Sequence, residues 1–190
     1  MGSWSQEPPG PAPRGDAPAV PVRHPTRGMP TAGRSCQDGI IVTGDQGHRH
    51  TVVRDGRAEE SPALARLLSQ LGHDVPPAWL RSWMKGASRA TDRVLVAEQT
   101  GEPVGVGVLH VTPFVHEAGQ RARLTALVID RHVRSQGVGD MLLKACEEVA
   151  LQMGCPVLEL TAADWRRDAH RFYERHGYTT VSRRYSKRLR

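Results

Sequence analysis

The segment 124–154 constrains the fold of this chain more than any other, because its apolar pattern changes period halfway along. Residues 124–130, LTALVID, become continuously apolar toward their end, which is typical of a buried strand. After the loop RSQGVGD at 134–140, apolar side chains recur every three or four residues from Leu142 to Met153, and Gly154 ends this helical run. The chain is therefore predicted to pass from a buried strand through a glycine loop into an amphipathic helix.

The other apolar patterns predict further strands and helices. Strands are expected at 50–56, 93–99, 103–111, 156–162 and 178–189, and helices at 61–72, 78–86 and 164–177. The first helix has Ser61 as its expected N-cap and Gly72 as its stop. This order of elements predicts one α/β domain whose sheet carries helices on its faces.

Residues 1–47 are expected to form a disordered extension rich in proline and glycine. They hold eight of the fourteen prolines and show no strand-like or helical apolar period. The alternative is a regulatory arm, and Met29 leaves open a later start that would omit residues 1–28. Residues 48–190 are then the single folded domain, since 190 residues have room for one sizeable core.

The net charge of +6 lies mainly at the two ends of the chain. Between Thr51 and Ser182 sixteen basic and sixteen acidic residues cancel, whereas the last eight residues, RRYSKRLR, hold five basic groups and no acid. A basic end either binds phosphate backbones and acidic surfaces or is a solvated terminal strand, and the second interpretation is favoured. Nucleic acid is therefore not the expected partner.

Cysteine content and hydropathy indicate a cytoplasmic protein. Cys36, Cys146 and Cys155 are an odd number without CxxC spacing, which argues against a disulfide framework and a zinc site. No run approaches the roughly 20 apolar residues of a membrane helix. The first twenty residues lack the apolar core of a signal peptide, so secretion is not indicated.

The loop at 134–140 has a physical use as an anion site, although a plain strand-to-helix turn is the alternative. A helix amino terminus leaves main-chain N–H groups unpaired, and glycine lets a bulky anion approach them. Gly137 and Gly139 stand where these N–H groups are expected. A nucleotide P-loop is excluded because no Lys-Ser or Lys-Thr follows Gly139. A dinucleotide fingerprint is excluded because its sixth position holds Leu142.

The pattern that does fit is R-x-x-G-x-G, from Arg134 to Gly139. It resembles the acyl-CoA pyrophosphate loop of the GNAT family of N-acetyltransferases, and AHRFYERHGY at 169–178 resembles the segment that follows the loop in that family. The resemblance extends over residues 50–189 and implies that 48–190 are an N-acetyltransferase domain. It also implies the GNAT fold, a mixed and mostly antiparallel sheet of six to seven strands with helices on both faces, in the order β-αα-βββ-α-β-α-β(β).

The family binds acetyl-CoA, its co-substrate, with the main chain of one strand and with the glycine loop. The resemblance assigns the pantetheine arm to Leu127, Val128 and Ile129, and the pyrophosphate to Arg134, Ser135, Gln136, Gly137, Val138, Gly139 and Asp140. Asp140 is expected to face solvent, because an inward carboxylate would repel the pyrophosphate. Arg166 replaces the family's usual asparagine and is expected to reach a phosphate of CoA.

Tyr173 matches the family's tyrosine, which often protonates the departing thiolate; the alternative is a packed core aromatic. An amine attacks a thioester only in its neutral form, so a base must remove a proton. The family's usual glutamate is missing from RARLTAL at 121–127. The candidate bases are Glu159, Glu117 and His110, in that order, and the oxyanion is assigned to a main-chain N–H near Val128. No covalent cysteine is needed.

The predicted function is transfer of an acetyl group from acetyl-CoA to the amine of a small molecule or a peptide, by direct attack in a ternary complex. One alternative is a GNAT-fold protein that binds CoA without catalysis. A less favoured one is a nucleic-acid-associated protein that uses its basic ends. The sequence leaves a homodimer open, and Trp79, Trp83 and His116 indicate a partly aromatic acceptor pocket.

Overall fold

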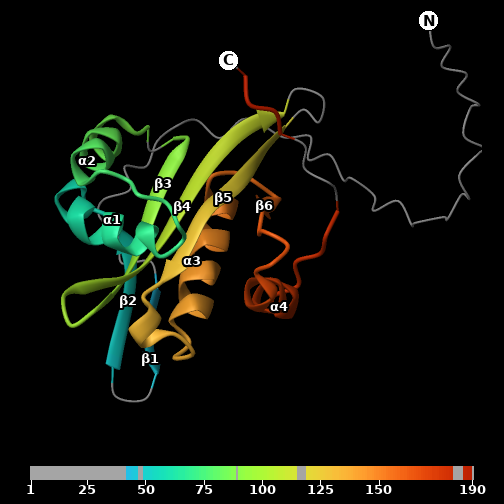
Figure 1. Ribbon diagram of the computed structural model, residues 1–190. Coiled ribbons are helices and arrows are strands. Elements are labelled where there is room, and N and C mark those ends of the chain that lie inside the picture. Colours follow the sequence, from blue (N-terminus) through green and yellow to red (C-terminus); the bar gives the residue numbers. More distant parts are fainter. Residues whose placement is uncertain (1–41, 47–48, 89, 115–118, 182–185, 190) are drawn as a thin grey trace, which may run out of the picture. The chain divides into compact units, whose positions relative to one another are not determined.

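The computed structural model describes residues 42–46, 49–88, 90–114, 119–181 and 186–189. They form one mixed sheet whose six strands stand in sequence order (Figure 1). The strands are β1 (Val42–Gln46), β2 (Arg49–Asp55), β3 (Asp92–Gln99), β4 (Glu102–Phe114), β5 (Gly119–Ile129) and β6 (Leu158–Leu160). Neighbouring strands are antiparallel except β5 and β6, which are parallel. The expected mixed, mostly antiparallel sheet is confirmed.

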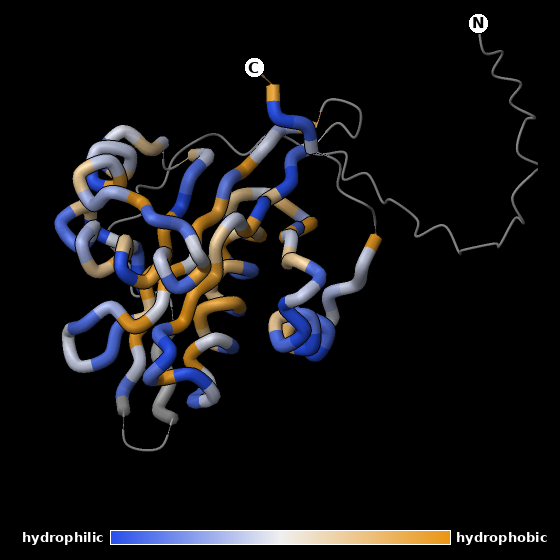
Figure 2. Tube along the Cα trace, in the orientation of Figure 1, coloured by the Kyte–Doolittle hydropathy of each residue, from blue (hydrophilic) through white to orange (hydrophobic). Residues whose placement is uncertain are grey.

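Helices cover both faces of the sheet, as expected (Figure 1). On one side, called the α1/α2 face, α1 (Ser61–Ser69) and α2 (Pro77–Gly86) pack on Val96, Val106 and Val128. On the other, the α3/α4 face, α3 (Val138–Gln152) and α4 (Arg167–Arg175) pack on Leu95, Leu109 and Leu124. Figure 2 shows hydrophobic segments along the central strands and on α3, whereas α4 is mostly hydrophilic. Within the described ranges no helix is long and apolar enough to cross a membrane.

The start of α1 differs from the sequence expectation. Ser61 is the first helical residue rather than the cap, and a short 3-10 turn, η1 (Ala58–Glu60), precedes it. Glu60 holds the N-cap position, but its carboxylate accepts hydrogen bonds from Arg54 at 3.0 Å and from the Arg57 main chain at 2.8 Å. The carboxylate is therefore used to anchor the turn to the sheet and not to cap α1.

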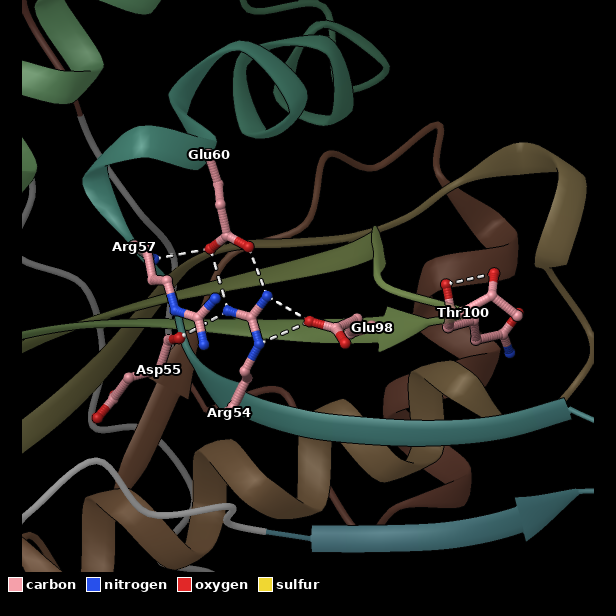
Figure 3. Close-up of polar contacts among 7 residues, drawn as sticks. Arg54, Asp55, Arg57, Glu60, Glu98 and Thr100 are labelled. Atoms are coloured by element: carbon pink, nitrogen blue, oxygen red, sulfur yellow. Dashed lines mark hydrogen bonds and ion pairs between the residues drawn. The ribbon is translucent and has the colours of Figure 1, made fainter.

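Arg54 joins β2, β3 and η1 (Figure 3). Its Nε donates to Glu98 at 2.7 Å, its Nη1 donates to Glu60, and all three side chains are largely buried. Burial acts to raise the pKa of Glu60, but the hydrogen bonds from Arg54 and the Arg57 main chain outweigh it, so the pKa is lowered. This network fixes the start of α1 against the sheet.

Both ends of the fold depart from the expected boundaries. β1 lies within the segment 1–47 that was expected to be disordered, and it pairs with β2. Residues 1–41 lie outside the described part of the chain, so the expectation for them stays a prediction. At the other end, 178–181 and 186–189 do not form the expected terminal strand. Tyr178 instead packs against the α3/α4 face, where its hydroxyl donates to Glu147 of α3 at 2.9 Å.

Candidate active site

The carboxyl-terminal half of β5 has no neighbouring strand on one side. β6 pairs with β5 only through Ala122–Leu158, Arg123–Glu159 and Leu124–Leu160. Beyond Leu124, β5 continues for five more residues beside β4, while the chain after β6 turns away toward α4 (Figure 1). Main-chain groups along this open edge are therefore available to a bound molecule.

The direction of these main-chain groups follows from the register. Asp130 N–H donates to the Val104 carbonyl at 2.8 Å, so the groups of Val128, two residues earlier, also point toward β4. Those of Leu127 and Ile129 point to the open edge. A β-bulge at Thr125 determines which main-chain groups of β5 point toward β4, because the register between the two strands shifts there. Of the three residues assigned to the pantetheine arm, Val128 therefore offers no main-chain group to this edge.

The glycine loop follows the open edge through a 3-10 turn, η3 (Arg131–Val133). Ser135 and Gly137 both have positive φ, 62° and 77°, and Gly137 is the N-cap of α3. The first helical hydrogen bond of α3 runs from Met141 N–H to the Gly137 carbonyl at 3.1 Å. Among the described residues no main-chain acceptor takes the N–H groups of Val138 and Gly139. Unpaired N–H groups at the start of a helix are the donors that an anion site requires.

Hydrogen bonds with α1 and with Gln70, the residue after it, hold the turn that leads into this loop. Asp130 accepts from the His132 main chain at 3.1 Å and from Arg66 at 2.9 Å, and these bonds lower its pKa against the effect of burial. Gln70 accepts from the Arg131 main chain at 3.1 Å. Arg134 donates to the Ile129 carbonyl at 3.1 Å, so its guanidinium also ties the loop to β5.

The sequence suggested that Asp140 faces solvent, but the structure shows that its side chain also has a partner. Its side chain is about half exposed, and Oδ1 lies 3.1 Å from Nε2 of His176 at the end of α4. His176 Nδ1 lies 2.8 Å from the Phe172 carbonyl. The carboxylate is therefore turned toward α4. The sequence gave no sign of this contact, because 36 residues separate the two side chains.

Tyr173 and Phe172 bring α4 to the glycine loop. The Phe172 ring lies 3.4 Å from the point that a Cβ on Gly139 would occupy, so a methyl group there would touch the ring and a larger side chain would meet it. Tyr173 packs in the core of the α3/α4 face, and burial raises its pKa, with the charge of Arg166 acting in the opposite direction. No hydrogen-bond partner of the Tyr173 hydroxyl occurs in the described part of the chain. The hydroxyl thus remains protonated and available as a donor.

Glu159 lies on β6 in register with Arg123 of β5. Its Oε1 is 3.3 Å from Arg123 Nη1 and its Oε2 is 3.9 Å from Arg121 Nη1. Leu158 and Leu160 point to the α3/α4 face, so Glu159 points to the α1/α2 face. Glu159 is therefore engaged by two guanidinium groups of β5.

His110, the third candidate base, has a carboxylate partner that the sequence did not reveal. Its Nδ1 lies 2.7 Å from Oδ1 of Asp92, the residue opposite it on β3. Its ring meets Trp83 of α2 edge-on, with centroids 5.8 Å apart. The second candidate, Glu117, lies outside the described residues, as does His116.

The buried thiols do not supply a nucleophile. Cys146 is fully buried beneath β4, where a Cβ on Gly107 would lie 2.7 Å from its sulfur. Burial raises the pKa of the Cys146 thiol to about 12 and also raises that of Cys155. Both thiols therefore stay protonated at neutral pH.

A surface hollow of about 470 Å³ lies elsewhere, between the start of α1 and α2. It is lined by Ser61, Pro77, Ala78, Arg81, Ser82 and Lys85. None of these residues belongs to the predicted site. The hollow is wide open and contains no side chain suited to be a general base, so the open edge of β5 remains the candidate site.

Comparison with known proteins agrees with this geometry. The profile of the acetyltransferase (GNAT) family matches residues 61–178, more than half of the chain. The aminoalkylphosphonate N-acetyltransferase of Salmonella typhimurium is 39% identical over 94 residues, which are 50% of this chain and 61% of that protein. The uncharacterized N-acetyltransferase YhfO of Bacillus subtilis is 33% identical over 133 residues, which are 66% of this chain and 88% of that protein.

Solved structures show the same architecture. A transcriptional regulator from Bacillus halodurans superposes with a TM-score of 0.66 and 22% identity, over 74% of this chain and all of that one. At that identity the likeness concerns the fold alone. The chain thus has an α/β fold with an open strand edge beside a glycine loop at the start of a helix. The chain belongs to the acetyltransferase (GNAT) family, whose members are N-acetyltransferases.

Proposed function

We propose that this protein transfers an acetyl group from acetyl-CoA to a primary amine by direct attack within a ternary complex. The observation that carries the proposal is the continuity of two features: the open edge of β5 at Leu127 and Ile129 leads directly into the loop whose N–H groups precede α3. A long thioester with a pyrophosphate at one end matches such a continuous row of main-chain donors and acceptors.

The residues present fit acetyl-CoA, which would supply the thioester carbonyl that the amine attacks. The N–H groups of Val138 and Gly139 would bind the pyrophosphate, assisted by the main chain of Ser135, Gln136 and Gly137. Arg166 at the start of α4 would contribute positive charge near Tyr173, in keeping with its lowering effect on the tyrosine pKa. Arg134 would act by fixing the loop, because its guanidinium is already bonded to β5.

Tyr173 is proposed as the general acid. As the amine nitrogen bonds to the carbonyl carbon, the carbon–sulfur bond breaks and the Tyr173 hydroxyl gives its proton to the departing sulfur. Its raised pKa keeps that proton in place until the thiolate forms. The Leu127 or Ile129 N–H, rather than that of Val128, is positioned to stabilise the oxyanion, because the Val128 groups face β4.

The acceptor is proposed to be a small primary amine. The relative from Salmonella typhimurium is named for aminoalkylphosphonates, and this chain spans only 61% of its length, so that substrate is a starting point for tests.

Two measurements test the proposal on the full chain. Acetyl-CoA at millimolar concentration should raise the melting temperature of the protein by mass action. Release of the free thiol of CoA should be detected when aminoalkylphosphonates, or another member of a panel of amines, are added with acetyl-CoA. A melting shift without acetylation of any amine in the panel would favour the CoA-binding alternative. Absence of both would contradict the proposal.

A further inference from the structure

Four ionisable side chains form a continuous row across the sheet. The strand registers place Asp92 opposite His110, His110 opposite Arg123, and Arg123 opposite Glu159. Neighbouring even-numbered residues of β3 and β4, such as Val94 and Val108, pack toward α1 and α2, so the row lies on the α1/α2 face. It crosses β5 one position before Leu124, where the pairing with β6 ends. The row therefore ends just before the open edge of β5 begins.

Asp92 fixes the orientation and tautomer of His110. Its Oδ1 lies 2.7 Å from His110 Nδ1, and Thr91 Oγ1 donates to its Oδ2 at 2.9 Å. Burial acts to raise the pKa of Asp92, but the hydrogen bonds from His110 and Thr91 outweigh it and lower the pKa. Because an ionised carboxylate only accepts hydrogen bonds, Nδ1 must carry the proton. The neutral imidazole then has its lone pair on Nε2.

The surroundings leave Nε2 of His110 available. The side chain is one-third exposed, and no hydrogen-bond partner for Nε2 occurs among the described residues. Trp83 packs edge-on against the ring and restricts its rotation. The charged neighbours that face His110 are Asp92 on β3 and Arg123 on β5. Arg123 in turn lies 3.3 Å from Glu159, the first of the candidate bases.

We infer that His110, held by Asp92, is the general base that deprotonates the acceptor amine. This inference rests on the proposed acetyl transfer and specifies one of its groups. The ammonium form of the acceptor, directly or through one water, gives a proton to Nε2, and the imidazolium is stabilised by the Asp92 carboxylate. The neutral nitrogen then attacks the thioester. Asp92 is a positioning residue, because it acts through His110.

The dyad can be tested without an acceptor. Nitrogen-15 NMR of the full chain, with His110 assigned through His110→Gln, reports which ring nitrogen carries the proton in the neutral form. The expected result is protonation at Nδ1. Protonation at Nε2 would overturn the inference, since no lone pair would then be directed away from Asp92.

The catalytic role is tested by pH profiles with whichever amine the wild-type protein acetylates, aminoalkylphosphonate being tried first. His110→Gln should lower kcat/KM about 100-fold or more near neutral pH. The loss should shrink at high pH, where the amine itself is neutral, while the melting shift caused by acetyl-CoA stays unchanged. Imidazole should restore part of the activity of His110→Ala, and Asp92→Asn should lower kcat without altering that melting shift.

Two variants serve as controls. Asp55→Asn breaks the ion pair of Asp55 with Arg93, 2.7 Å apart on the opposite face, and should leave the pH profile unchanged. Glu159→Gln should retain the pH dependence of the wild type. If Glu159→Gln abolishes that dependence and His110→Gln keeps it, His110 is not the base. If the wild-type protein acetylates no amine, the proposed function fails, and the NMR result still decides whether the dyad exists.

Discussion

The Phe172 ring of α4 lies 3.4 Å from the position of a Cβ on Gly139. The first turn of α3 therefore packs against α4, the helix that carries Tyr173, at this glycine. A larger side chain must push α4 away from the loop. Gly139→Val should lower the free energy of unfolding by about 1–3 kcal/mol and weaken the melting shift caused by acetyl-CoA. Gly139→Ala, whose added methyl group only touches the ring, should lose much less. Urea unfolding and thermal melts of both variants would check this, and equal losses would contradict the packing argument.

Removing the Tyr173 hydroxyl should affect turnover rather than donor binding. Tyr173→Phe is expected to lower kcat by about 100-fold, because the thiolate loses its proton donor, while the acetyl-CoA melting shift is retained. The matched control is Tyr178→Phe. That hydroxyl bonds to Glu147 at 2.9 Å, so its loss should lower stability by about 1 kcal/mol and leave kcat intact. Unchanged kcat in Tyr173→Phe would remove this residue from the acid role.

The Arg54 network should be one of the larger single contributors to stability. Arg54→Met leaves Glu60 and Glu98 largely buried without their partner, which is expected to lower the free energy of unfolding by about 3–5 kcal/mol. Arg171→Met removes an exposed pair with Asp168 and should cost about 0.5 kcal/mol or less. Urea denaturation of the two variants compares them directly, and similar losses would show that the network contributes little.

Stability should fall in acid. The pKa values of Glu60, Asp92 and Asp130 are lowered in the folded state from ordinary values of 4.5, 3.8 and 3.8. Each carboxylate therefore stabilises the fold above its ordinary pKa, and this contribution disappears as the pH falls through the lower folded-state pKa. The melting temperature should decline below about pH 4.5. In Arg54→Met the decline should be shallower, because Glu60 no longer has its guanidinium partner.

The sequence by itself determined the elements that depend on near neighbours. The glycine loop, the amphipathic α3 and the hydrophobic strands were predicted because turn chemistry and apolar period act over a few residues. The family followed from the same segments, since the loop and AHRFYERHGY are local patterns. Misplaced features, such as the cap at Ser61 and the terminal strand, were those where a distant partner overrode local preference. The Glu60 carboxylate accepts a hydrogen bond from Arg54, and the Tyr178 hydroxyl donates one to Glu147 of α3.

Tertiary structure alone decided which side chains meet. Asp92, His110, Arg123 and Glu159 come from four strands, and their alignment depends on strand register. That register includes the bulge at Thr125, which also directs the Leu127 and Ile129 main chain to the open edge. A shift of one residue would turn every side chain of a strand to the other face. Residues far apart in sequence acquire such a relationship only when the sheet forms.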